Sequence, residues 1–438
     1  MKRKLGQAVL ILLAFVFLLG TANGCSKANN NTSKGTVEVT FWQPDLATWQ
    51  PAYKKLVDQF EKDHADIKVK MVNFPEEGYN EKLNTTFAAN QGPDIWVNMD
   101  TSQHAYAKGY IQPLDEFINR DKVNMDQYFP NVKMNVTGKD GKIYGLPRDD
   151  SPTFIIYNKD LFDKYHIVYP KDSWTWDDFR TDAKELTHPA DKIYGTDAMS
   201  DTWTMLYGEP WLWDMGANVI SDDGTKAVGY LDSEGVIKVA QFAQNVAKDG
   251  SQVPSSLSDS FSGDFGGFTT GKIGMSAGSL WGYETLSEVK FNWGAVKLPM
   301  PPEVADTYSF WTAALYAMNA KSKHPNEAWE FLKFLGSEQA GDIVIQNGKI
   351  WTPAVKNCWI KAGWDKDEHL SFAYYLGEKQ TKNFCVNLSA NFYNEYAPVD
   401  DAWKSIVDPV KGQNYADPAT ALKKAAHEVQ ANLDKNNQ

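Results

Sequence analysis

The sequence predicts an α/β protein with two lobes. After residue 35 the chain continues for about 400 residues, which is more than one hydrophobic core usually organises. Hydrophobic residues make up 42% of the chain and charged residues 23%, as in ordinary globular proteins. From residue 36 onward, strand-like and helix-like segments alternate. This order indicates a parallel sheet whose strands are joined by right-handed crossovers.

The first five elements follow one another closely. The predicted strands cover residues 36–42, 67–72 and 94–98, and the predicted helices cover 53–63 and 79–89. Gly92-Pro93 separates the second helix from the third strand. In open sheets of this kind, ligands bind beyond the carboxyl ends of the strands. We therefore expect the segments 42–45 and 98–100 to border a ligand.

The later elements are predicted from the same patterns. Strand-like runs occupy 142–147, 154–157, 273–276 and 312–318, and helices are expected at 174–186, 236–248, 326–335 and in most of 402–433. Ser173 is a suitable N-cap for the first of these helices, and Pro325 suits the start of the third. The polar segment 148–151 separates the first two strand-like runs.

The N-terminal segment has the three parts of a secretory signal. Residues 2–4 are basic, residues 8–19 are apolar, and small residues precede Cys25. The apolar run is too short to cross a hydrocarbon core of about 30 Å comfortably. The placing of Cys25 resembles a bacterial lipoprotein signal, which implies a signal peptide over 1–24 and a lipid such as palmitate on Cys25. An ordinary cleaved signal is the alternative. The polar segment 25–35 would be a flexible tether, so we expect an exported protein anchored to the cell membrane, facing the extracellular side or the periplasm.

Charge and metal-ligand spacing exclude several classes of function. The net charge is −12, and loss of a signal with three basic residues and no acidic one would make it more negative. This balance argues against nucleic acid and against adhesion to anionic lipid. None of the seven histidines lies within four residues of another, so we expect no metal site and no cofactor. Cys358 and Cys385 could form a disulfide or remain buried thiols.

Several short motifs share one order along the chain. They are Phe60-Glu61-Lys62 with Ile67-Lys68-Val69, Gly92-Pro93-Asp94-Ile95, Gly109-Tyr110-Ile111-Gln112-Pro113-Leu114, Tyr144-Gly145-Leu146-Pro147 with Tyr157-Asn158-Lys159-Asp160-Leu161-Phe162, and Gly271-Lys272-Ile273-Gly274-Met275 before Trp281. Together they resemble the extracellular sugar-binding receptors of ABC importers, the maltose-binding-protein-like group of family 1 solute-binding proteins. The resemblance covers roughly residues 36–355.

This resemblance implies a type II periplasmic-binding-protein-like fold. Lobe 1 would comprise 36–150 plus 312–352, and lobe 2 would comprise 151–311 plus 353–438. A ligand between the lobes would close them by a hinge motion that the importer reads. The implied function is capture of a sugar, expected to be an oligosaccharide, and its delivery to the permease subunits. We expect a monomer without enzymatic activity.

Aromatic residues are the predicted platforms for sugar rings, because flat rings suit the apolar faces of a pyranose. The chain has 16 tryptophans and 20 tyrosines, many of which must lie in the core. Trp42 and Trp311 are chosen by their places at the first strand and at the return crossover. Trp211 and Trp281 are chosen because the resemblance places ligand contacts there, and Trp213 is included because it lies in the same segment as Trp211. Core packing is the alternative for each.

Polar candidates would bind the hydroxyl groups. Asp45 follows the first strand. The resemblance implies contacts by Asp100 and by Glu209 in the loop Glu209-Pro210-Trp211, and its acid near the first crossover falls closest to Ser151. Arg148, Asp149 and Asp150 lie beside that position, where a charge-assisted network around hydroxyls or a structural ion pair is possible.

Rival functions remain open at this stage. Gly274-Met275-Ser276-Ala277-Gly278 fits the G-x-S-x-G pattern of esterases, but no helix is evident after it. A secreted glycosidase would also combine acids and aromatic platforms. A receptor of the same fold could cage a cationic ligand such as a polyamine or a peptide.

Overall fold

The chain divides into two units, Met1–Gly35 and Thr36–Gln438, and only the second is described below. The computed structural model describes residues 35–44, 47–99, 106, 108–199, 209–254, 257, 265–280, 285–286, 289–302, 304, 307, 311–312, 314–347, 351–379, 392–408 and 414–436. Within these residues the structure contains two separate β-sheets, which confirms the predicted α/β fold with two lobes.

The first sheet has five strands in the order β2-β1-β3-β10-β4. Their bounds are Val37–Pro44 for β1, Ile67–Phe74 for β2, Ile95–Asn98 for β3, Leu146–Pro147 for β4 and Leu315–Met318 for β10. The first three strands are parallel, as predicted, and β10 runs antiparallel to both β3 and β4. The sheet is therefore completed by a strand that lies more than 200 residues after β3 in the sequence.

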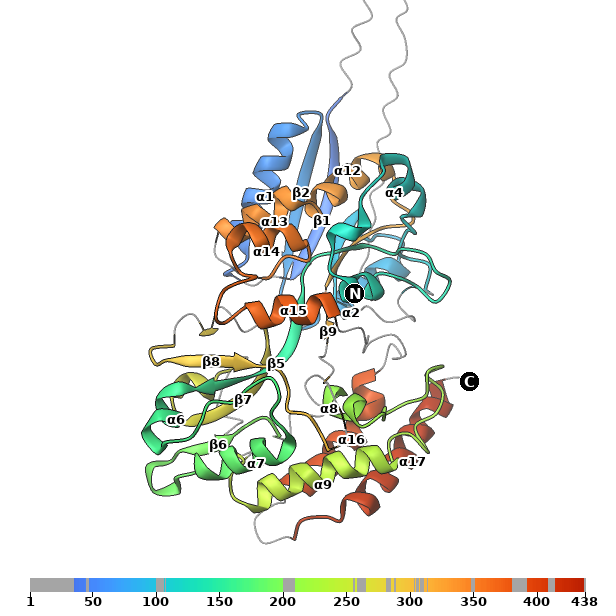
Figure 1. Cartoon of the computed structure of the whole chain (residues 1–438). Helices are drawn as coiled ribbons and strands as arrows, with labels where there is room; N and C mark the ends of the chain where they lie inside the picture. The colour runs from blue at the N-terminus through green and yellow to red at the C-terminus, as the bar shows by residue number, and fades with distance from the viewer. Residues whose placement is uncertain are drawn as a thin grey trace, which may run out of the picture. The chain divides into compact units, whose positions relative to one another are not determined.

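Helices cover both faces of this sheet (Figure 1). Their bounds are Gln50–Asp63 for α1, Tyr79–Ala88 for α2, Asp115–Asp121 for α4, Pro325–Leu335 for α12 and Glu338–Gln346 for α13. Residues of β10 alternate between the two faces, as expected for a strand. Tyr316 and Met318 join the core under α1 and α12, whereas Leu315 and Ala317 join the core under α2.

The second sheet has the strand order β6-β7-β5-β8, and β9 pairs with the start of β5. The bounds are Ser151–Asn158 for β5, Tyr194–Thr196 for β6, Ile273–Ser279 for β7, Trp293–Val296 for β8 and Trp311–Thr312 for β9. Strands β6 and β7 are parallel, and the other pairings are antiparallel. The central strand β5 is buried along its whole length, consistent with coverage on both faces.

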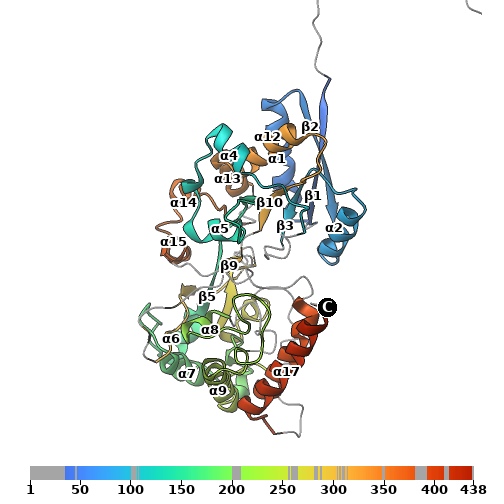
Figure 2. The ribbon, with the colours of Figure 1, turned by 90° about the vertical axis from the view of Figure 1, so that its right-hand side faces the viewer.

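A helical layer with a large apolar core packs on the second sheet (Figure 2). It contains α6 Lys159–Tyr165, α7 Trp176–Glu185, α8 Glu209–Asp214, α9 Glu234–Lys248, α16 Phe392–Val407 and α17 Pro418–Asn436. The side chain of Gln244 on α9 donates to the backbone oxygens of Ile406 at 3.1 Å and Ala416 at 2.7 Å. Helix α7 begins after Thr175, whose side chain forms a capping box with Asp178, so the expected cap at Ser173 is two residues too early.

Residues from three segments that run between the sheets are hydrogen-bonded to one another, and we call residues 148–151, 312, 314 and 352–354 the crossover. The Arg148 N–H donates to the Ala314 oxygen at 2.9 Å, and the Ala354 N–H donates to the Arg148 oxygen at 3.2 Å. The Asp150 N–H donates to the Thr352 oxygen at 2.9 Å. The crossover is therefore a small three-stranded unit rather than three independent linkers.

Helices α14 Lys356–Ala362 and α15 Ser371–Lys379 belong to the segment that the sequence assigns to lobe 2. In the structure α14 packs on α13, and α15 packs on α5 Pro130–Asn135 as well as on β5 (Figure 1). Phe129, Trp359 and Tyr374 form ring contacts there, with centroids 5.4–6.3 Å apart. These helices therefore surround the crossover, whereas α16 and α17 cover the second sheet.

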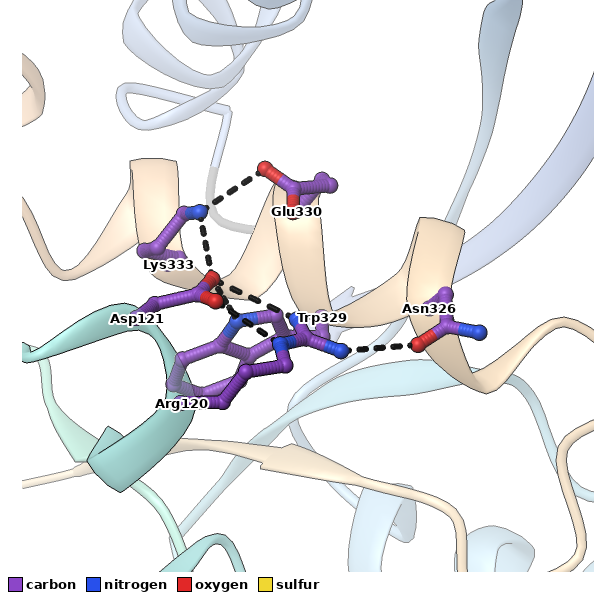
Figure 3. A network of polar contacts seen from close by, with 6 residues as sticks. All are labelled: Arg120, Asp121, Asn326, Trp329, Glu330 and Lys333. Atoms are coloured by element: carbon purple, nitrogen blue, oxygen red, sulfur yellow. Dashed lines mark hydrogen bonds and ion pairs between the residues drawn. The ribbon is translucent and has the colours of Figure 1, made fainter. Parts of the chain in front are cut away.

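A polar network ties α4 to α12 on the first lobe (Figure 3). The Asp121 carboxylate accepts from Trp329 Nε1 at 2.8 Å, from Lys333 Nζ at 2.7 Å and from Arg120 Nε at 2.7 Å. Arg120 also donates to the Asn326 side chain at 3.0 Å. Hydrogen bonds from Arg120, Lys333 and Trp329 lower the pKa of Asp121 below its usual range. The network holds the two helices in register.

Candidate ligand site at the strand ends

The topology places the carboxyl ends of the parallel strands beside the crossover in both lobes. In the first sheet, Asn98 at the end of β3 pairs with Leu315, which directly follows the crossover residue Ala314. In the second sheet, Ser279 at the end of β7 pairs with Thr153, near the start of β5. A ligand bound next to the crossover could therefore meet the strand ends of both sheets.

An aromatic platform stands at the first of these edges. Trp42, the predicted platform at the end of β1, is half-buried and packs on Phe74 at the end of β2, with ring centroids 4.4 Å apart. The Tyr79 hydroxyl, at the start of α2, lies 3.1 Å from the backbone oxygens of both Trp42 and Val97. The strand ends are thus held together by a buried side chain below the platform.

Amide side chains lie at the same strand ends, with Gln43 and Asn73 on the opposite face of the sheet from the platform, because side chains alternate along a strand. Gln43 Nε2 donates to Asn73 Oδ1 at 2.7 Å, and Trp96 Nε1 donates to Asn98 Oδ1 at 3.2 Å. Gln43 has no exposed surface, and its Oε1 atom has no hydrogen-bond partner among the described residues. Gln43 and Asn98 lie in the segments 42–45 and 98–100 that were expected to border a ligand, but neither they nor Asn73 were singled out as contacts from the sequence.

A shallow, open depression begins at Asn98 and follows α2. Its lining includes Asn80, Asn84, Phe87, Asn98, Lys108 and Tyr110. Phe87 and Tyr110 are stacked with centroids 5.3 Å apart, and Lys108 Nζ donates to Asn84 Oδ1 at 3.2 Å. The depression thus combines ring surface with amide groups, as sites for polyhydroxylated ligands do.

Arg148 and Asp149 are buried in the crossover instead of lining open space. Arg148 Nε donates to Asp149 Oδ2 at 3.0 Å, and the guanidinium lies over the rings of Trp49 at 4.7 Å and Trp351 at 5.3 Å. Asp149 Oδ1 accepts from the Ala314 N–H at 2.8 Å. Burial lowers the pKa of Arg148, but the charge and hydrogen bond of Asp149, together with Tyr53 and Tyr316, outweigh it, so the pKa lies above its ordinary value. These contacts support a role in the hinge better than the predicted contact with hydroxyl groups.

Asp150 is also fully buried in the crossover. Its Oδ1 atom accepts from Asn131 Nδ2 at 3.4 Å, whereas Oδ2 has no hydrogen-bond partner among the described residues. Burial raises the pKa of Asp150 well above its ordinary value, and the charge of Asp149 adds to this effect. The Asp150 carboxyl therefore lies in the interior next to Asn131 and is not exposed to solvent. Its direct contact with a ligand stays a prediction.

Trp211 and Trp213 lie in the core of the second lobe. Both are on α8, and Trp211 has no exposed surface. Its ring packs against Trp176, Phe179 and Phe242, with centroids 5.6–5.9 Å apart. The Glu209-Pro210-Trp211 motif begins a short helix here, and the core of the second lobe surrounds both rings. Neither ring offers a free face to a sugar in this structure, so the structure favours the core alternative for both.

The other predicted contacts lie wholly or partly outside the described residues. Asp45, Asp100 and Trp281 lie outside the described residues, as do Cys25 and Cys385. Glu209 begins α8 and Trp311 lies in β9, paired with Pro152, but their side chains are also outside the described part. Cys358 is a buried free thiol.

The structure bears on the esterase pattern, on metal binding and on membrane-spanning helices. Ser276 of the G-x-S-x-G pattern lies inside β7 and pairs with Ile156, whereas a nucleophile elbow is a turn between a strand and a helix. In the described part of the chain, no group of three or more His, Cys, Asp or Glu side chains could hold a metal ion. Among the same residues, no helix has the length and apolar character needed to cross a membrane.

Two α/β lobes, joined by a hydrogen-bonded crossover that borders aromatic and amide side chains, define a solute-binding receptor of the periplasmic-binding-protein type. The model of the bacterial extracellular solute-binding proteins matches residues 55–371. The chain therefore belongs to this family, whose members are binding proteins and not enzymes. The predictions of the receptor class and of binding without turnover are confirmed.

Individual relatives agree with this assignment. The galactooligosaccharide-binding protein of Bacillus subtilis is 28% identical over 361 residues, which cover 80% of each chain. The arabinooligosaccharide-binding protein of the same organism is 24% identical over 363 residues, covering 79% of this chain and 78% of the relative.

Solved structures share the fold. An ABC substrate-binding protein of Listeria monocytogenes in complex with cycloalternan has a TM-score of 0.74 at 22% identity, covering 91% of this chain and 99% of the other. The sugar-binding protein MalE of Xanthomonas citri has a TM-score of 0.75 at 20% identity, covering 92% and 98%.

Proposed function

We propose that the protein captures an oligosaccharide outside the cell and delivers it to the permease of an ABC importer. The observation that carries the proposal is the edge of the first sheet at its carboxyl strand ends, which carries both the Trp42–Phe74 platform and the amides Gln43, Asn73 and Asn98. Ring faces suit the apolar side of a pyranose, and amides can both donate to and accept from its hydroxyl groups. The names of the relatives, two of which bind oligosaccharides, support the same class of ligand.

Hinge closure at the crossover is the proposed signal to the permease. The crossover segments are joined by their backbones, so the lobes can rotate about a defined unit while each sheet keeps its own core. Asp45, Asp100, Glu209, Trp281 and Trp311 keep their predicted places as ligand contacts in this proposal. We also propose that the receptor acts as a monomer, since one chain supplies both lobes.

A thermal-shift screen over mono- and oligosaccharides tests the proposal. We expect an oligosaccharide to raise the melting temperature, because a ligand that binds only the folded state stabilises it by about 2.7 kcal/mol at a hundred times its Kd. No cleavage product should appear during incubation. A shift with polyamines or peptides, and none with any sugar, would contradict the proposed ligand class.

Trp42→Ala should weaken binding of the oligosaccharide found in that screen by about tenfold or more, because a stacked ring contributes about 1.4 kcal/mol or more. Isothermal titration calorimetry measures the Kd of both proteins. The matched control is Trp293→Ala. Trp293 is also half-buried and stacks on His369 at 3.9 Å, but it pairs with Asn158, at the end of β5 far from the crossover. If the two variants lose affinity to the same extent, Trp42 is not a ligand contact.

The lipid anchor at Cys25 is a further part of the proposal, supported by the sequence pattern of residues 1–25. Cys25→Ala should move the protein from the membrane fraction to the soluble fraction of the producing bacterium and abolish labelling by a palmitate analogue. Cys358→Ala is the control, because that thiol is buried in the second unit. Unchanged membrane association of the Cys25 variant would leave an ordinary cleaved signal as the better explanation.

A further inference from the structure

The carboxyl group of Asp150 is held inside the crossover with one oxygen unpaired. The side chain has no exposed surface, and its Oδ1 atom accepts a single long hydrogen bond, from Asn131 Nδ2 of α5 at 3.4 Å. The Oδ2 atom has no hydrogen-bond partner among the described residues. The backbone is fixed as well, because the Asp150 N–H donates to the Thr352 oxygen at 2.9 Å. The fold therefore keeps an acid in a place where a charge would be poorly solvated.

Helix α15 covers the unpaired oxygen. Gly377 of this helix is buried, and a Cβ atom at its position would lie 3.0 Å from Asp150 Oδ2 and 2.7 Å from the ring of Phe129. Glycine thus lets the backbone of α15 approach the carboxyl closely. Because Asn131 contacts the other oxygen, the carboxyl lies between α5 and α15, which also pack on each other.

The same helix contacts both lobes beside the crossover. On the side of lobe 1, the ring of Tyr374 packs on Phe129 with centroids 5.4 Å apart. On the side of lobe 2, the ring of Phe372 packs on Phe154 of β5 with centroids 4.7 Å apart. A change in the docking of α15 therefore changes the contacts that join the lobes at the hinge.

The charged groups around Asp150 are acidic, or are cations already paired with another acid. Burial raises the pKa of Asp150, and the charges of Asp149 and of Glu378 on α15 add to this effect. Arg148 is bound to Asp149, and Lys356 of α14 is bound to Glu378 at 3.3 Å. The neighbour on α5 is an uncharged amide. An ionised Asp150 would therefore have no cation of its own among the described residues, which is costly for a buried group.

We propose that Asp150 is a proton-dependent lock on the hinge: α15 stays docked while the carboxyl is protonated, and loss of the proton accompanies release of the helix. When α15 moves away, water solvates the carboxylate, and the group then ionises at about pH 4, as aspartate ordinarily does. Above that pH, each further unit favours the released form by about tenfold until the docked form ionises too. The lock acts on the hinge of the proposed function and requires no contact between Asp150 and the ligand.

Hydrogen–deuterium exchange of the full chain without ligand tests the lock. The exchange rates are first corrected for the intrinsic effect of pH on amide exchange. The protection of α15 should then fall by about tenfold per pH unit between about pH 5 and pH 8 in wild type, because the released form is the one that exchanges. Asp150→Asn keeps the shape of the side chain but cannot ionise, so the protection of α15 should not depend on pH in this variant.

The matched control is Asp223→Asn, which changes an acid in an exposed turn. Hydrogen bonds from Ser221 and Thr225 lower the pKa of Asp223 to about 2, so this carboxylate stays ionised over the whole range tested. The control variant should therefore show the same fall in the protection of α15 as wild type.

Two results would overturn the lock. One is a corrected protection of α15 that does not change with pH in wild type, a measurement that does not depend on the folding of any variant. The other is the same fall in Asp150→Asn, since another group would then be responsible. Neither measurement uses a ligand, so failure of the lock is distinguishable from failure of the proposed function, which the thermal-shift screen decides.

Discussion

Arg148→Ala is expected to lower the free energy of unfolding by about 3–5 kcal/mol, because it leaves the fully buried Asp149 without its partner. It also removes the cation that lies over the rings of Trp49 and Trp351. Asp149 is bound to the Ala314 N–H in the returning segment, so the loss should disturb two of the three crossover segments. The variant should therefore lose hinge rigidity as well as stability.

Urea unfolding followed by tryptophan fluorescence measures this loss, provided that a single transition is observed. The control is Lys54→Ala, which breaks an exposed pair with Asp58 at 2.8 Å and should cost less than about 1 kcal/mol. The double variant Arg148→Met with Asp149→Leu should recover part of the stability, because it leaves no unpaired charge buried. A loss below about 1 kcal/mol in Arg148→Ala would show that the pair does not hold the crossover.

Trp211→Ala is expected to destabilise the protein by about 3–5 kcal/mol, because it removes a fully buried ring that packs against three others. The core around α8 also includes Trp176 and Phe242, whose large rings cannot easily fill the space that is left. The sequence alone suggested the opposite result, a folded protein that no longer binds its ligand. The two expectations are therefore easy to tell apart.

The experiment compares unfolding and binding in one variant. Under conditions where Trp211→Ala is still folded, the oligosaccharide should produce nearly the same thermal shift as in wild type, from a lower starting temperature. Trp42→Ala should show the reverse, a small change in stability and a large loss of the shift. An unchanged unfolding curve with abolished binding would make Trp211 a sugar platform and would contradict its position in the core.

Most regular elements could be predicted because their periodicity is local. The alternation in β1 and the helical spacing in α1 and α12 reflect which side of each element meets the core. The short strands were harder to predict. β4 has two residues and β9 has two, too few for a pattern, and their pairing depends on partners far away in the chain. The positions of α14 and α15 around the crossover likewise depend on contacts that no local pattern encodes.

The part of the candidate site that lies at strand ends could be predicted from the sequence. Trp42 follows from its place at the end of β1, and the same rule places Gln43 and Asn98 at strand ends without deciding which of these side chains binds a ligand. Trp211 could not be assigned, since a tryptophan beside a proline fits either a loop or the start of a helix. Asp150 shows the same limit. Its polar sequence context suggests a surface, and only the packing of α5 and the third crossover segment buries it.

Strand β10 lies late in the sequence, so the first sheet cannot be completed until most of the chain is available. An N-terminal fragment that ends before residue 315 lacks the strand that pairs with both β3 and β4, so it exposes the side of β3 that this strand covers. The first lobe therefore cannot close its sheet until three-quarters of the chain has emerged, and such distant pairings make folding slow. An exported polypeptide has to stay unfolded while it passes through a secretion pore. Because the first sheet forms only after its last strand is available, folding of the first lobe is delayed during that passage.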